Sequence, residues 1–306
     1  MENDSTASSA ARDVIWRSTG ETLAIRLVLV DATDTSNQIA EAHGAKNYAR
    51  QLLGEAVSGA LLLASGLKGP GTAQLRFSLS GDFTRLAADA TPMGLVRAMI
   101  PKDELNRTGN FEPVMMPQTL SVRKLDREGN RISEGIVEME SLDISTSITH
   151  YLHQSEQGKA LVRVIAACDP AGEKLAFSGG FLLEGFPGLP EQEWQAFNRL
   201  AQSLDLTTFA RPEGGLNLGA IFRSLMGAVP AQVHQEFKVE SYCPCTEEGV
   251  LRAMAGLGKA ELESLFLEGE EVEVFCEFCR RRYAIGTDKV LALLNEAEEN
   301  EGEKLP

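Results

Sequence analysis

The sequence predicts an α+β protein in three parts: a large core of sheet and helices, an amphipathic helical linker, and a small C-terminal domain with four cysteines. Three observations predict this fold class. Many β-rich segments and one long Ala/Leu-rich helical segment precede residue 187. Two amphipathic helical segments follow, and four of the five cysteines then occur in two close pairs. A chain of 306 residues is also long enough for more than one domain.

The predicted core covers residues 19–187, and residues 1–18 are small and polar enough to predict a flexible tail. Residues 22–30 are β-rich and predict a strand. Residues 36–66 carry apolar side chains at helical spacing and predict one or two helices, which end before a Gly-Pro-Gly breaker. Further along the core, a short helix is predicted at 145–154, and strands at 73–79, 94–100, 119–125, 132–139, 161–167 and 174–183. We expect these strands to form one large sheet.

Two turns support this series of strands. Residues 126–130 (Asp-Arg-Glu-Gly-Asn) separate two β-rich segments, which is a strong hairpin signal. Residues 169–172 (Asp-Pro-Ala-Gly) have proline at the position that a type I turn favours. The strands on either side of each turn are therefore predicted to pair with one another.

The predicted linker covers residues 188–238. Apolar side chains fall on one helical face in 194–204 and again in 218–226, and the Pro/Gly-rich loop 211–215 separates the two segments. Amphipathic helices of this kind ordinarily pack on a core. Because these lie between a β-rich core and a cysteine cluster, we expect a metastable linker.

Charge and composition argue against several function classes. The chain has 29 Lys and Arg against 44 Asp and Glu, a formal net charge of −15. Nucleic acids and anionic membranes both attract clustered basic residues, so we expect neither as a partner. The start of the chain resembles no leader, and no apolar run is long enough to span a bilayer, which predicts a cytoplasmic protein. Familiar nucleotide-binding, hydrolase and metalloprotease motifs are absent from the sequence, and we expect no enzymatic activity.

The last predicted domain, residues 239–306, contains Cys243, Cys245, Cys276 and Cys279. Its pattern of apolar residues predicts helices at 247–267 and 287–299 and short strands at 272–275 and 283–285. Paired cysteines at this spacing in a reducing compartment bind metal more often than they form permanent disulfides. Four thiolates suit one Zn²⁺ ion per chain and leave no open position for a substrate or an activated water. These four residues are therefore the predicted zinc ligands, and a hydrolytic zinc enzyme is disfavoured.

Four functions are considered for such a site. A purely structural zinc site is the simplest, and a zinc-ribbon adaptor would use it to bind a partner. A thiol–disulfide oxidoreductase would need its Cys-x-x-Cys at a helix N-terminus, whereas Cys276 follows a predicted strand. The unusual Cys-x-Cys spacing favours a reversible redox switch, because a disulfide between such close cysteines is strained.

The cysteine spacing near the end of a chain of this mass resembles that of the redox-regulated 33-kDa heat-shock chaperone family of bacteria. The resemblance extends to residues 37–39 (Asn-Gln-Ile), 78–83 (Ser-Leu-Ser-Gly-Asp-Phe), 151–157 (Tyr-Leu-His-Gln-Ser-Glu-Gln) and 179–183 (Gly-Gly-Phe-Leu-Leu). Members of that family often have glycine directly after the last cysteine, where this chain has Arg280.

The resemblance implies an ATP-independent holdase that is inactive while its four thiolates hold zinc. Oxidation would then form the disulfides Cys243–Cys245 and Cys276–Cys279, release zinc and unfold the small domain and the linker. The opened chain would form a homodimer and bind unfolded client proteins.

Three further residues have metal-binding or redox side chains without a clear partner. Cys168 is expected to be a small buried apolar side chain. His150 and His153 have helical spacing, but no carboxylate set lies nearby in the sequence, so we expect them to serve in packing or at the surface.

Overall fold

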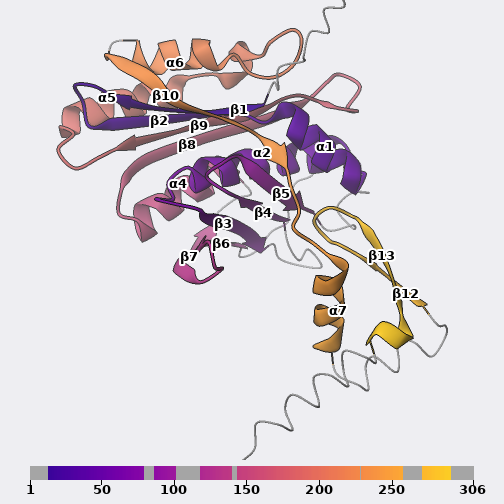
Figure 1. The fold of residues 1–306 in the computed structure, drawn as a ribbon. Helices are drawn as coiled ribbons and strands as arrows, with labels where there is room; N and C mark the ends of the chain where they lie inside the picture. Colours follow the sequence, from indigo (N-terminus) through magenta and orange to yellow (C-terminus); the bar gives the residue numbers. More distant parts are fainter. Residues whose placement is uncertain are drawn as a thin grey trace, which may run out of the picture. The chain divides into compact units, whose positions relative to one another are not determined.

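The computed structural model describes residues 13–78, 86–100, 118–139, 143–227, 229–257 and 271–290. The chain divides into two compact units, Met1–Tyr242 and Cys243–Pro306. The elements of both units are drawn in Figure 1. Neither unit has a described helix that is long and apolar enough to cross a membrane.

The first unit contains two sheets rather than the one that the sequence predicts. Sheet A has the order β10-β1-β2-β9-β8, with all neighbours antiparallel. Its strands are β1 (Val14–Gly20), β2 (Ile25–Asp31), β8 (Lys159–Cys168), β9 (Leu175–Gly185) and β10 (Ala231–Lys238). Sheet B has the order β11-β5-β4-β3-β6-β7 and is antiparallel except for the β11–β5 pair. Its strands are β3 (Gly71–Ser78), β4 (Leu86–Ala90), β5 (Leu95–Met99), β6 (Gln118–Asp126), β7 (Arg131–Met139) and β11 (Glu240–Ser241).

Three of the described helices lie between the two sheets (Figure 1). They are α1 (Thr33–His43), α2 (Asn47–Ala64) and α4 (Ile144–Ser155). Helix α2 is buried along nearly its whole length, which agrees with the apolar and small residues that make up most of its sequence. Gly54 and Gly59 allow its neighbours to approach closely, since an added Cβ would lie 2.8 Å from Ser178 Oγ and 2.6 Å from Ile148 Cδ1 respectively. The expectation of a single sheet is wrong because this helical layer needs an apolar sheet on each side.

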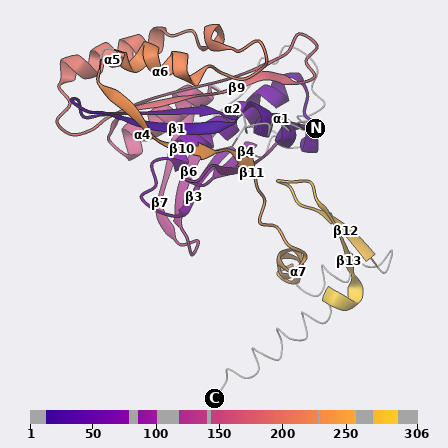
Figure 2. The same ribbon diagram turned by 45° about the horizontal axis from the view of Figure 1, so that its top comes forward.

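The outer face of sheet A is covered by α5 (Glu191–Ser203) and α6 (Leu218–Met226), as Figure 2 shows, and by the 3₁₀ helix η1 (Leu206–Phe209) between them in the chain. Their apolar faces and those of β2, β8 and β9 form a second apolar cluster, separate from the one around α2. Trp194, Phe197 and Ile221 are buried against Leu27 and Phe181 in this cluster. Both predicted amphipathic helices are thus confirmed. Whether they act as a linker remains a prediction.

Two strands of sheet A lie where the sequence suggested none. Strand β1 begins at Val14, so the predicted tail is wrong for residues 14–18. Asp13 is structural as well, because its carboxylate accepts the backbone N–H groups of Asp34 (3.1 Å) and Thr35 (2.5 Å) at the start of α1. Strand β10 lies within the predicted linker and pairs with β1 across more than 200 residues of sequence. The two residues of β11 pair with β5, so they belong to the first unit and not to the cysteine domain.

The second unit contains α7 (Glu247–Ala255) and a two-stranded antiparallel sheet of β12 (Glu271–Phe275) and β13 (Arg282–Gly286). Its apolar core is small and consists of Met254, Tyr283, Ile285 and Val290, with partly buried neighbours. The helix predicted at 247–267 is confirmed as far as residue 255, and the part at 258–267 lies outside the described residues. The helix predicted at 287–299 is confirmed for 287–290, and its remainder lies outside them too.

A cavity of about 930 Å³ in the first unit is lined by α2, α4, β8 and the end of β7, and contains a carboxyl group that is costly to ionise. Burial, together with the negative charge of Asp143, raises the pKa of Glu55 to about 8. The folded state therefore binds this proton more strongly than the unfolded chain. The resulting stabilisation is complete below the unfolded pKa of about 4.5 and is lost as the pH rises through 8.

We expect Glu55→Gln to increase the free energy of unfolding of the first unit at pH 8 by about 1–3 kcal/mol, after allowance for partial solvent access. The dependence of the free energy of unfolding on pH between about 5 and 8, measured by urea unfolding, should become flatter. Glu41→Gln, at an exposed position on α1, is the matched control. An unchanged pH profile in the Glu55 variant would contradict the prediction.

Candidate metal centre

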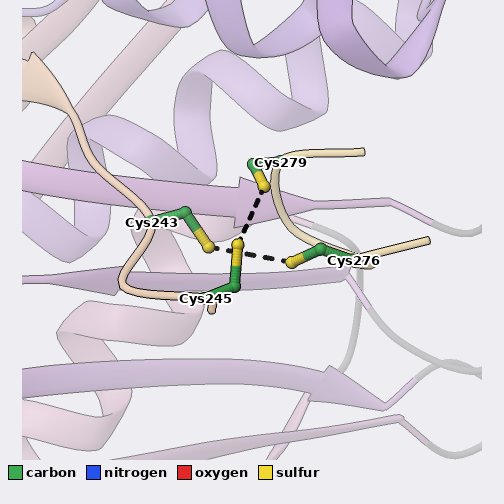
Figure 3. Close-up of side chains that lie close together, drawn as sticks. All are labelled: Cys243, Cys245, Cys276 and Cys279. Carbon is green, nitrogen blue, oxygen red and sulfur yellow. Dashed lines mark hydrogen bonds between the residues drawn. The ribbon is translucent and has the colours of Figure 1, made fainter. Parts of the chain in front are cut away.

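The four cysteines predicted as zinc ligands meet at one point of the second unit (Figure 3). Cys243 and Cys245 lie on the segment before α7, and Cys276 and Cys279 on the turn between β12 and β13. The Sγ atoms of Cys243 and Cys276 are 3.7 Å apart, and those of Cys245 and Cys279 are 3.3 Å apart. All four Sγ atoms lie within 4.8 Å of one another.

This geometry fits a four-coordinate metal ion. Tetrahedral coordination with Zn–S distances of about 2.3 Å places the sulfur atoms about 3.8 Å apart. The donor set consists of four soft thiolates, which favour Zn²⁺ over Mg²⁺ or Ca²⁺. All four cysteines are half-buried, so solvent reaches the cluster. They are the one group of possible metal ligands among the described residues, and they could hold a metal ion.

The turn that carries Cys276 and Cys279 is closed by two backbone hydrogen bonds. The N–H of Arg280 donates to the carbonyl of Cys276 (2.9 Å), and the N–H of Cys276 donates to the carbonyl of Arg281 (3.0 Å). This turn requires a left-handed backbone at Arg280, where φ is 58°. Glycine adopts that conformation without steric cost, whereas in other residues the Cβ atom makes it unfavourable. Arg280 therefore keeps the turn at the expense of local strain.

We expect Arg280→Gly to tighten zinc binding by about three- to tenfold, since relief of a left-handed residue contributes on the order of 1 kcal/mol and folding of the unit is coupled to metal binding. Competition with a chromogenic chelator under reducing conditions measures this affinity. Arg281→Gly, at a position with an ordinary φ, is the control and should give no gain. Equal affinities for the Arg280 variant and the unmodified chain would contradict the prediction.

Tyr283 is a site residue that the sequence analysis missed. Its hydroxyl lies 3.1 Å from Sγ of Cys245 and 3.1 Å from the carbonyl oxygen of the same residue. Its ring is buried in the small core of the unit. An aromatic residue that alternates with polar ones in a strand is typical of a core position, so no signal in the sequence indicated a contact with a cysteine.

The cysteines differ in how easily they ionise. Partial burial opposes ionisation of Cys245, but the hydrogen bonds from Tyr283 and the other three cysteines outweigh it and lower its pKa to about 7. Burial, and then the proximity of Cys245 and Cys276, raises the pKa of Cys279. Four thiolates this close together repel one another, so a cation is needed before all of them can ionise.

The other three candidate residues are in the first unit and do not form a metal cluster with one another. His153 Nε2 contacts the carbonyl oxygen of Ala160 (2.7 Å), and His150 lines the cavity beside α4. Cys168 is half-buried rather than fully buried as expected, and its thiol contacts the carbonyl oxygen of Asn47 (3.5 Å). Burial raises the pKa of Cys168, which disfavours its reactive thiolate.

Comparison with known proteins places these features in a family. The model of the family described as "Hsp33 protein" matches residues 13–286. A 33 kDa chaperonin of Pelobacter propionicus is 29% identical over 295 residues, which cover 93% of this chain and 95% of the relative. The 33 kDa chaperonin of Bacillus subtilis is 28% identical over 277 residues, which cover 88% and 94% of the two chains.

A crystal structure shows the same fold. The 33 kDa chaperonin of Thermotoga maritima superposes with a TM-score of 0.78 at 22% identity, covering 94% of this chain and 99% of that one. The family match spans nearly all of the first unit and most of the second, including all four clustered cysteines. On this evidence the chain belongs to the Hsp33 family of chaperones.

Proposed function

We propose that this chain is a redox-regulated, ATP-independent holdase that binds unfolding proteins under oxidative stress. In the reduced state, Cys243, Cys245, Cys276 and Cys279 hold one Zn²⁺ ion. Peroxide takes two electrons from each pair of thiols, is reduced to water, and leaves a disulfide in place of two metal ligands. The four-thiolate cluster in a chain of a chaperone family is the observation that carries this proposal.

Loss of the ion is then sufficient to unfold the second unit. Its described core has four buried residues and one two-stranded sheet, which is marginal without further support. From residue 235 onward the chain carries 17 acidic and 8 basic side chains, so self-repulsion favours expansion once the ion is gone. Oxidation is thereby converted into unfolding.

The client-binding surface in this proposal is the apolar outer face of sheet A. In the closed chain, α5, η1 and α6 cover that face, and the helical part of the proposed linker 188–238, residues 191–226, is the part that leaves it. Leu27, Phe177 and Phe181 are among the side chains that would become accessible. Their apolar area suits the exposed apolar segments of an unfolding protein. We further propose that the oxidised chain forms a homodimer and acts in the cytoplasm.

A thermal-aggregation assay with citrate synthase as client tests the proposal. Peroxide-treated protein should suppress light scattering without ATP and release one zinc ion per chain, whereas reduced protein should do neither. A variant with all four clustered cysteines changed to serine is the control that cannot form these disulfides. Equal suppression by reduced and oxidised protein contradicts redox control, and insulin reduction by the chain would favour an oxidoreductase instead.

The proposed disulfides are Cys243–Cys245 and Cys276–Cys279, although close Sγ–Sγ contacts of 3.7 Å and 3.3 Å join the two pairs to each other. A disulfide between the pairs would hold the two halves of the second unit together. Disulfides within each pair leave the halves free to separate, which is what release of the unit requires.

We expect Cys276–Cys279 to form first, because Cys-x-x-Cys closes with less strain than Cys-x-Cys and Pro244 stiffens the other pair. Client binding should follow the second disulfide. Time-resolved thiol trapping with mass spectrometry measures both the order and the pairing. Early formation of Cys243–Cys245, or disulfides that join the two pairs, would show that the prediction is wrong.

A further inference from the structure

The loop between η1 and α6 makes the most deeply buried charged contact between the predicted linker and the core. A backbone bridge between Ala210 and Leu216 closes this loop, and the N–H of Arg211 donates to the carbonyl of Gly215 (2.8 Å). Gly214 and Gly215 both have left-handed backbones, with φ of 97° and 84°. The loop is therefore a built structure that aims the side chain of Arg211 in one direction.

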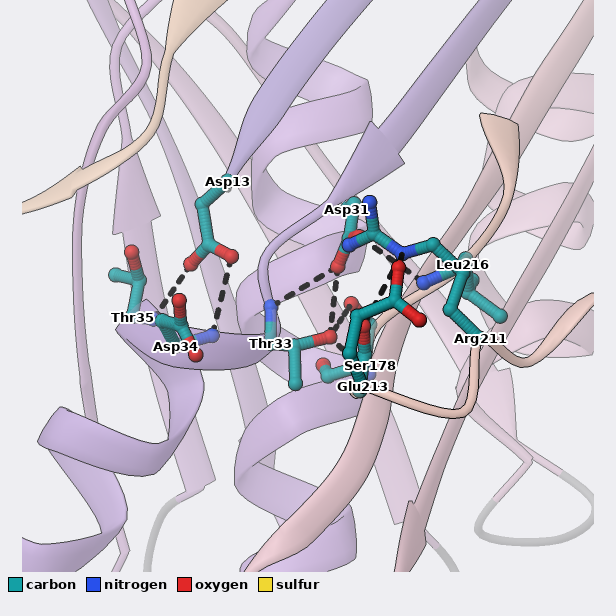
Figure 4. A network of polar contacts seen from close by, with 10 residues as sticks. Asp13, Asp31, Thr33, Asp34, Thr35, Ser178, Arg211, Glu213 and Leu216 are labelled. Carbon is teal, nitrogen blue, oxygen red and sulfur yellow. Dashed lines mark hydrogen bonds and ion pairs between the residues drawn. The ribbon is translucent and has the colours of Figure 1, made fainter. Parts of the chain in front are cut away.

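Arg211 points at Asp31, the last residue of β2 (Figure 4). One Asp31 oxygen accepts from Arg211 Nη2 (2.8 Å) and from the backbone N–H of Leu216 (3.0 Å). The other accepts from the hydroxyl (2.7 Å) and, more weakly, the N–H (3.3 Å) of Thr33 in α1. The Asp31 side chain is 1% exposed, and it joins β2, α1 and the loop at one point.

The close fit at this point depends on Gly215. A Cβ at Gly215 would lie 2.3 Å from Arg211 Nη2 and 2.5 Å from Asp31 Oδ2. The backbone N–H of Gly215 also donates to the carbonyl of Ala176 in β9 (2.8 Å). Water is thus excluded from the carboxylate while the loop is in place.

We propose that the Arg211–Asp31 ion pair is the lock that holds the segment 191–226 on sheet A, and that it sets how readily the segment opens. This inference rests on the proposed function. The reason is an asymmetry between the two states. In the closed state the Asp31 carboxylate has little water and depends on Arg211, whereas in the open state water solvates it. Loss of Arg211 therefore destabilises the closed state alone.

Two observations support this assignment. Burial raises the pKa of Asp31 above its usual value even though Arg211 lies beside it. The closed state therefore disfavours the Asp31 carboxylate, and Arg211 offsets only part of that cost. The other described ion pair between the segment and the core, Lys159–Glu191, is much more exposed, at 36% and 61%. Exposed pairs of that kind contribute little.

The test uses reduced, zinc-loaded full-length protein and the variant Arg211→Met. Amide hydrogen exchange in residues 191–226 should become faster by on the order of 10- to 100-fold, and citrate synthase aggregation should be suppressed without oxidant. Zinc content should stay at one ion per chain. Arg123→Met, which breaks the exposed Arg123–Glu134 pair of sheet B, is the matched control and should behave like the unmodified chain.

A second change checks the cause. In Asp31→Asn/Arg211→Met the buried charge is gone, so much of the protection in 191–226 should return. Exchange in the strands of sheet B reports whether each variant is folded. If Arg211→Met fails to fold, Arg211→Lys decides instead: it keeps one charge contact but loses the donor to Gly214, and should accelerate exchange several-fold.

The outcomes separate the two proposals. Unchanged exchange in a folded Arg211 variant overturns the lock, even where oxidised unmodified protein still suppresses aggregation. Fast exchange in 191–226 without suppression supports the lock and overturns the proposed use of the sheet A face for clients. If protection does not recover in the double variant, the lock is also overturned, because the faster exchange in Arg211→Met then comes from lost packing of the arginine side chain.

Discussion

Removal of zinc from the reduced chain is expected to unfold the second unit while the first unit stays folded. Structural zinc contributes about 10–16 kcal/mol of apparent binding free energy in small zinc domains. A core of this size supplies at most about 3–5 kcal/mol. The core of the described part of this unit is built around Met254, Tyr283, Ile285 and Val290, and Tyr283 itself contacts the ligand Cys245. Loss of the ion therefore removes more than the whole stability of the unit.

Hydrogen exchange after addition of a strong chelator and a reductant measures this result, because the reductant prevents disulfides from forming. Amides in 247–255, 271–275 and 282–286 should lose protection, and amides of sheets A and B should keep theirs. Cys168→Ser is a control in which the response should not change, since that residue is in the first unit. A second unit that remains protected without metal would contradict both this prediction and the proposed switch.

Local patterns in the sequence were sufficient where the partners are close in the chain. The turn at 126–130 predicted the β6–β7 hairpin, and the turn at 169–172 predicted the β8–β9 pair. Both amphipathic helices before the cysteine domain were also predicted correctly. These elements depend on turn chemistry and on the period of apolar residues, which a single sequence displays directly.

The errors concern contacts between distant segments. Strand β10 is polar and exposed along most of its length, so it lacks the alternation that identifies a strand. It forms because β1 offers an edge, and the sequence predicts a tail rather than a strand for most of β1. The split into two sheets likewise depends on where α2 lies. Pairing of this kind is determined by tertiary packing rather than by local propensity.

The candidate metal site could be predicted almost completely, because spacing and donor chemistry define a four-thiolate site without knowledge of the fold. Two of its features could not. Tyr283 reaches Cys245 only through the β12–β13 pairing, and the backbone strain at Arg280 is a property of the folded turn. The sequence shows which residues are present, but these two roles depend on backbone geometry.

The second large effect expected is from Trp194→Ala, a change on the inner face of α5. Trp194 is 7% exposed in the second apolar cluster, close to Gly185 of β9. Truncation of a buried tryptophan costs about 3–5 kcal/mol through lost apolar contact and the cavity that remains. Leu200→Ala, on the same helix at a side chain that is 39% exposed, should cost much less and serves as the control.

The pattern of protection in reduced Trp194→Ala protein shows whether the helices that cover sheet A behave as a linker. If they do, exchange should accelerate in 191–226 and in the strands of sheet A that these helices cover. Sheet B and the zinc-bound unit should keep the protection of the unmodified chain. Equal loss of protection in both sheets would mean that α5 and α6 unfold only together with the core. The proposed switch could not then open sheet A, because exposure of the client surface would require unfolding of the whole first unit.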